Sequence, residues 1–191
     1  HALGIKVVIV HGSRPQVEEQ LALRKVETRF HNGLRITDSV ALECAKEAAG
    51  EIRLDIEAAF SQGLPNTPMA NSAIRVISGN FVLARPMGII DGVDLEHTGV
   101  TRKVAHETIN PILDAGALIL LSPLGFSPTG EVFNLAMEDV ALAASTALRA
   151  DKLIFITETP MMTDAGGAEI REVSAHLAEA ILQSGCLRAD S

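Results

Sequence analysis

The chain of 191 residues has the length of one ordinary domain, enough to bury a sizeable core. Its 24 acidic side chains outnumber the 16 basic ones, and the net charge of −8 argues against a nucleic-acid partner, because no lysine- or arginine-rich stripe offsets it. No apolar run reaches the roughly 18 residues that a membrane span requires, so we expect no membrane partner.

The N-terminal third of the chain predicts a strand followed by two helical stretches. Residues 5–10 form an unbroken apolar run, IKVVIV, typical of a strand that is covered on both faces of a parallel sheet. A proline at the first helical position predicts a helix over 15–25. Thr37 or Asp38 can cap a stretch over 38–62, which is either one long bent helix or two abutting helices, because a glycine interrupts it.

The middle of the chain predicts short strands. After a loop over 64–72, residues 74–86 indicate two strands around Ser78–Asn80, which form either a hairpin-like or a ligand-facing turn. A further hairpin or irregular pair is expected over 93–104, and a helix over 105–114.

The last part of the chain alternates strands with helices. In chain order we expect a strand over 117–121, a hairpin at 129–130, a helix over 136–149, a strand over 152–157 and a helix over 174–183. This alternation predicts an α/β fold: a three-layer αβα sandwich with a mainly parallel central sheet.

The cysteines and the chain ends indicate the setting of the protein. Cys44 and Cys186 lie far apart and outside any CxxC spacing, and no secretory segment precedes them, so we expect reduced thiols in a cytoplasmic protein. The chain begins at His1 without an initiator methionine and stops just past a predicted helix, so we expect an excerpt of a longer protein, incomplete at both ends.

Open α/β sheets bind ligands outside the carboxyl ends of their strands, and loops over 11–15, 123–134 and 157–167 occupy such positions. In the first loop, Gly12 allows a ligand to approach the backbone, and the start of a helix favours an anion. Ser13 and Arg14 place side chains where a phosphate loop has glycines, and the following proline removes an amide donor. The loop therefore predicts either a carboxylate site that uses Arg14, or a plain turn.

Two further polar residues are candidates for the same site. Arg35 lies between a glycine turn and a helix cap and can aim at the sheet edge; the alternative is an ordinary surface arginine. Asn134 ends a predicted strand just before a helix, where the alternative is an N-cap. The six histidines show no metal-binding spacing, so no metal site is expected.

The segments VVIVHGSRPQ, HNGLRITD, VISGNFVLARPMGIIDGVD, GEVFN and TDAGGAEI together resemble the amino-acid-kinase (carbamate-kinase-like) fold. Within it they are most similar to the N-terminal domain of the bacterial N-acetylglutamate synthase family, over essentially the whole chain. The resemblance implies that a separate C-terminal acetyltransferase domain transfers acetyl from acetyl-CoA to L-glutamate in arginine biosynthesis. The present segment would bind no cofactor and hold no catalytic residue. It would serve in feedback inhibition by L-arginine and in assembly of a homo-oligomer.

Acetylglutamate kinase, an ATP-dependent sister family, is the alternative that this resemblance raises. Gly12, Arg35 and Asn134 match positions of its motifs. Ser13–Arg14 replaces its glycines, and Glu138 stands where the kinase has an aspartate. This chain shows neither of the regions that carry the two kinase lysines, and phosphoryl transfer depends on positioned cations, so we expect no kinase activity from this segment. A third possibility is a free-standing amino-acid sensor.

Overall fold

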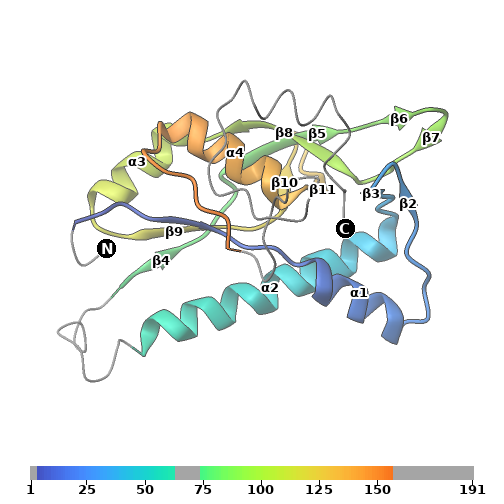
Figure 1. The fold of residues 1–191 in the computed structure, drawn as a ribbon, viewed down its shortest axis with the longest axis horizontal. Helices are drawn as coiled ribbons and strands as arrows, with labels where there is room; N and C mark the ends of the chain where they lie inside the picture. The colour runs from blue at the N-terminus through green and yellow to red at the C-terminus, as the bar shows by residue number, and fades with distance from the viewer. Residues whose placement is uncertain (1–3, 63–73, 157–191) are drawn as a thin grey trace, which may run out of the picture. The chain divides into compact units, whose positions relative to one another are not determined.

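The computed structural model describes residues 4–62 and 74–156 (Figure 1). The chain divides into two units, His1–Leu153 and Ile154–Ser191, and every helix and strand named below belongs to the first. The predicted loop over 64–72, the candidate loop over 157–167 and the predicted helix over 174–183 lie outside the described residues.

A parallel sheet contains the first strand of the chain, as predicted. Its order is β1 (Val8–Val10), β9 (Leu118–Leu121) and β4 (Val76–Ile77), and both pairings are parallel. All residues of β9 are buried, as expected of an unbroken apolar run in a strand covered on both faces, whereas β1 is shorter than the predicted 5–10 and its residues are only half-buried. The backbone amide of His11 donates to the Leu121 carbonyl at 3.1 Å, so the pairing extends to the start of the first candidate loop.

A second sheet lies beside the first and is mixed. Its order is β11 (Val132–Asn134), β10 (Leu124–Phe126), β5 (Val82–Pro86) and β8 (Gly99–Val104). The β10–β5 pairing is parallel and the other two are antiparallel. The predicted hairpin at 129–130 is confirmed as the β10–β11 connection.

Two hairpin predictions are wrong in detail. The turn at Ser78–Asn80 closes no hairpin, because β4 pairs with β9 in the first sheet whereas β5 joins the second. Residues 93–104 do not pair among themselves either: β8 returns to pair with β5, and β7 (Val93–Asp94) pairs with β6 (Ile89–Ile90). The tertiary fold decides which strand each short strand pairs with, and the pattern of residues within a strand does not show which partner it has.

The helices agree closely with the predictions. They are α1 (Arg14–Leu23), α2 (Ser39–Ser61), α3 (His106–Asp114) and α4 (Met137–Leu148). α2 is one helix, and the Asp38 carboxylate caps it by accepting from the Ala41 amide at 2.8 Å. α1 ends before the predicted residue 25, because Lys25 adopts a left-handed conformation with φ of 59°.

The helices cover the strands from two sides, which gives the three layers (Figure 1). α3 and α4 pack with Ile119 of β9 and Val104 of β8 in one apolar cluster. α1 and α2 pack together in a second cluster, which includes Leu124 of β10. Among the described residues, no helix combines the length and apolar content that crossing a bilayer requires.

The predicted strand over 152–157 is wrong for residues 152–156, the part that the structure describes. These residues adopt no regular structure. A strand needs a neighbour that satisfies its amides and carbonyls. Apolar composition alone is therefore insufficient here.

The second sheet depends on a close approach at Gly125 of β10. A Cβ placed there would lie 2.5 Å from the Ala84 Cβ and 2.8 Å from the Leu135 Cδ1. We expect Gly125→Ala to lower the free energy of unfolding by about 1–3 kcal/mol, because the added methyl overfills a packed site. Gly50→Ala is the control: nothing lies within 4 Å of a Cβ placed on this glycine of α2, so helix propensity should make it neutral or stabilising. Urea unfolding of both variants measures the difference, and equal stabilities would refute the steric argument.

Candidate ligand-binding pocket

All the candidate residues line one pocket of about 240 Å³; they are Gly12, Ser13, Arg14, Arg35 and Asn134. It lies where the turn after β1, the β2–β3 hairpin, the end of β11 and the start of α4 meet. Here β2 is Phe30–His31 and β3 is Leu34–Arg35, a hairpin that the sequence did not reveal. Two of the three predicted loops thus converge at the carboxyl ends of strands, whereas residues 78–80 do not line the pocket.

The turn after β1 presents a glycine and two side chains to the pocket. Nothing lies within 4 Å of a Cβ placed on Gly12, so the space in front of this glycine is open. Ser13 is buried and is the N-cap of α1, but its hydroxyl makes no capping hydrogen bond. Arg14 and Pro15 begin the helix, so the first turn offers fewer amide donors than a glycine-rich phosphate loop.

Arg35 is a buried residue, so the surface-arginine alternative is wrong. Its side chain is 8% exposed, and its Nη2 donates to Glu18 Oε1 of α1 at 2.6 Å. The Arg35 Cζ lies 5.2 Å from the centroid of the Phe30 ring, and the Arg14 Cζ lies 5.3 Å from the same centroid. Both pocket arginines are therefore within cation–π range of one ring, which sets where their guanidinium groups lie.

Glu18 is held in its ionised form. Burial raises the pKa of this carboxyl, but hydrogen bonds from Thr28 and Arg35 and the charges of Arg35 and Arg14 outweigh it, so the pKa is lowered. The Thr28 hydroxyl donates to Oε2 at 2.7 Å while Arg35 uses Oε1. Both carboxylate oxygens therefore have partners within the chain.

Asn134 lies at the end of β11 and is not a helix cap, because the N-cap of α4 is Ala136. Its side-chain amide donates to the Thr37 Oγ1 at 3.2 Å, and the Thr37 Oγ1 lies 2.9 Å from the Thr98 Oγ1. The Thr98 hydroxyl also contacts the Arg35 carbonyl oxygen. Because a hydroxyl has one hydrogen, the Thr98 hydroxyl and the Thr37 hydroxyl each donate one hydrogen bond in this series of contacts.

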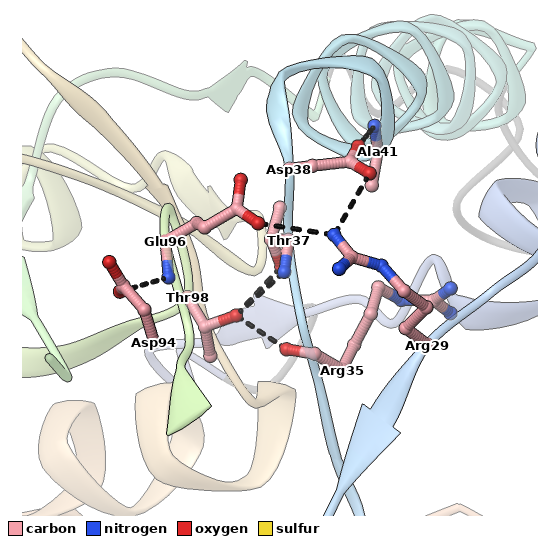
Figure 2. Close-up of polar contacts among 8 residues, drawn as sticks. All are labelled: Arg29, Arg35, Thr37, Asp38, Ala41, Asp94, Glu96 and Thr98. Carbon is pink, nitrogen blue, oxygen red and sulfur yellow. Dashed lines mark hydrogen bonds and ion pairs between the residues drawn. The ribbon is translucent and has the colours of Figure 1, made fainter. Parts of the chain in front are cut away.

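The Thr98 hydroxyl fixes the backbone at the entry to α2 (Figure 2). It accepts from the Thr37 amide at 3.1 Å and contacts the Arg35 carbonyl, so one buried side chain of the β7–β8 region joins both residues. Thr37 is fully buried and Thr98 is 6% exposed. Thr98 was not predicted from the sequence. There it is one of several polar residues that precede a strand, and nothing distinguishes it from the others.

Arg29 reinforces the same junction from the surface. Its Nη2 lies 3.4 Å from the Asp38 Oδ2 at the cap of α2 and 3.1 Å from the Glu96 Oε1, as Figure 2 shows. The amide of Glu96 in turn donates to the Asp94 Oδ1 at 2.9 Å. These contacts are partly exposed and individually weak, so the buried threonines carry more of the stability.

The pocket wall at the start of α4 is acidic. Glu138 and Asp139 lie in the first turn of α4, and both line the pocket. No lysine is among the lining residues that the structure describes. Within the described part of the chain, no cluster of histidine, cysteine, aspartate or glutamate side chains is arranged to hold a metal ion.

The comparisons with known proteins identify the family. Residues 1–186 match the model of the amino acid kinase family, so the chain belongs to this family. It is 61% identical to an amino-acid acetyltransferase of Ralstonia nicotianae over 191 residues, which cover all of this chain and 42% of that relative. A similar enzyme of Pseudomonas fluorescens is 49% identical over 183 residues, 96% of this chain and 42% of the relative.

A solved structure gives the same result. The structure of N-acetylglutamate synthase from Neisseria gonorrhoeae, complexed with coenzyme A and L-arginine, matches with a TM-score of 0.87 and 34% sequence identity. The match covers 95% of this chain and 43% of that chain. The chain thus spans well under half the length of these relatives.

Removing the Thr98 hydroxyl tests the buried network. Thr98→Val leaves the Thr37 amide and the Arg35 carbonyl without this partner, so we expect a loss of about 1–3 kcal/mol in the free energy of unfolding. Thr101→Val, in β8 just beyond Thr98, is the matched control, because the buried Thr101 Oγ1 has no hydrogen-bond partner in the structure. The control should be neutral or stabilising in denaturant unfolding. Equal losses in both variants would exclude a special role for Thr98.

His11 predicts a pH dependence of stability. Burial lowers the pKa of this imidazole, despite an opposing contact between its Nδ1 and the Gly12 carbonyl at 3.0 Å, and its buried Nε2 has no hydrogen-bond partner among the residues that the structure describes. The unfolded state therefore binds more protons, and the stability that neutral His11 provides is fully present above pH 6.5 and is lost as the pH falls below it. Unfolding free energies between about pH 7.5 and 5 should fall less steeply in His11→Gln. Parallel curves would contradict this assignment.

Proposed function

We propose that the chain is the N-terminal domain of an N-acetylglutamate synthase. In the intact protein, acetyl would pass from acetyl-CoA to the amine of L-glutamate within a C-terminal acetyltransferase domain that lies beyond this segment. Support comes from the 61% identity to an amino-acid acetyltransferase and from the 0.87 TM-score match to a solved N-acetylglutamate synthase. The domain of the amino acid kinase family would then have a non-catalytic role in a protein whose acetyl transfer takes place in another domain.

The charged residues that line the pocket are the main support for a non-catalytic role of this domain. Phosphoryl transfer needs cations placed around the moving phosphate. Among the described lining residues, the positive charges are those of Arg14 and Arg35, no lysine is present, and Glu138 and Asp139 are acidic. The turn after β1 has few amide donors and no lysine is among the described lining residues, so few groups are placed to hold a nucleoside triphosphate and acetylglutamate kinase is the weaker candidate despite the shared fold.

We further propose that the pocket binds a small ligand carrying a carboxylate. Gly12 leaves open space at its wall, Ser13 and Arg14 supply polar groups at the start of α1, and Arg35 and Asn134 approach from the hairpin and from β11. Charge-assisted hydrogen bonds to arginine are the strongest contacts available to a carboxylate. The volume of about 240 Å³ suits a small metabolite.

The regulatory part of the proposal concerns the intact protein. The domain would take part in feedback inhibition by L-arginine and in assembly of a homo-oligomer in the cytoplasm, with L-glutamate and acetyl-CoA as substrates of the whole enzyme. A related synthase was solved with coenzyme A and L-arginine, and another crystal of it held coenzyme A and N-acetyl-glutamate. Those ligands support the proposal by analogy.

The full-length protein tests this function directly. We expect release of coenzyme A from acetyl-CoA that depends on L-glutamate and that L-arginine reduces, and no ADP from ATP with N-acetyl-L-glutamate. Replacing L-glutamate by N-acetyl-L-glutamate in the first assay is the control, because its amine is already acylated. Steady ADP formation without coenzyme A release would establish the kinase instead.

A further inference from the structure

The buried cation of the pocket is already contacted by a carboxylate of the same chain. Arg35 Nη2 donates to Glu18 Oε1 at 2.6 Å, a contact of the kind that a ligand carboxylate would make. The Arg35 side chain is 8% exposed whereas that of Glu18 is 40% exposed, and Glu18 is not among the residues that line the pocket. A ligand that contacts Arg35 must therefore share the guanidinium group with Glu18.

Glu18 is positioned independently of any ligand. Thr28 donates to its second oxygen at 2.7 Å, and α1 fixes the residue one turn beyond the Ser13–Arg14 turn. Thr28 also lies 3.4 Å from the Arg35 Nη1, so the three side chains form a closed triangle of contacts. Such a triangle holds the carboxylate ionised and in place at neutral pH.

The sum of charges then decides which ligands are favoured. Among the described lining residues, Arg14 and Arg35 contribute two positive charges and Glu138 and Asp139 contribute two negative ones, and Glu18, which contacts Arg35 from outside the lining, adds a third negative charge. A dianion would meet this excess of negative charge, whereas a ligand with one carboxylate and one ammonium group can place its cation near the acidic wall.

We propose that Glu18 is a specificity-determining residue for the pocket: its carboxylate pairs with Arg35 from outside the lining and selects small zwitterions over dicarboxylates and phosphates. This inference rests on the proposed ligand-binding role of the pocket. A site with this preference differs from a site that binds an acyl amino acid with two negative charges. The residue that sets the preference would be Glu18 on α1, which no sequence motif marks.

Two probes of matched length test the selection in the full-length protein. Glutarate and 4-aminobutanoate share three methylene groups and one carboxylate, and they differ in the second charged group. By isothermal titration calorimetry, we expect the parent to bind 4-aminobutanoate more tightly than glutarate. Glu18→Gln should strengthen glutarate binding by about tenfold or more, because a charged hydrogen bond to Arg35 becomes available. It should change 4-aminobutanoate binding far less.

The controls separate this inference from the proposal beneath it. Glu19→Gln removes the same charge from an exposed neighbour on α1 and should alter neither probe. Arg35→Ala should weaken glutarate binding to the Glu18→Gln background, which locates the probe in the pocket. Equal glutarate affinities in the parent, Glu18→Gln and Glu19→Gln would overturn the role of Glu18 while leaving a ligand site. Absence of binding by either probe to the parent and to Glu18→Gln would overturn the ligand site as well.

Discussion

The buried hydroxyl of Thr98 is the interaction on which the arrangement of the pocket depends. It accepts from the Thr37 amide and contacts the Arg35 carbonyl. These two backbone groups lie where the chain passes from the β2–β3 hairpin to α2, and without Thr98 they would lack this partner. Buried backbone groups without partners are costly, so the link holds the start of α2 beside β8. Asn134 joins through Thr37, and the arginine that faces the pocket is thereby tied to two strands of the second sheet.

The domain has the form of a ligand site, and the charges of its pocket are the basis of the ligand preference proposed for it. The turn after β1 still ends a parallel strand and begins a helix, the position at which α/β proteins meet anions. Side chains and a proline occupy this turn, a carboxylate covers Arg35, and two acidic residues start α4. Membership of the amino acid kinase family therefore describes the scaffold, and the pocket residues decide the chemistry.

Much of the fold could be predicted because its signals are local. The unbroken apolar runs marked β1 and β9, and the cap at Asp38 and the proline at the start of α1 marked helices, since these features act within one strand or one helical turn. The strand predicted over 152–157 failed for its described residues because pairing needs a neighbour, which composition cannot supply. The hairpins around 78–80 and 93–104 failed for the same reason.

The sequence by itself determined the fold class, the helices and which loops carry polar residues at strand ends, because periodicity and capping are contained in adjacent residues. It also marked Arg35 and Asn134, though not what they contact. Only the tertiary structure decided that Glu18 pairs with Arg35 and that Asn134 reaches Thr37, residues 17 and 97 positions apart. Such contacts arise where separate elements pack, and no local pattern records the distance between them.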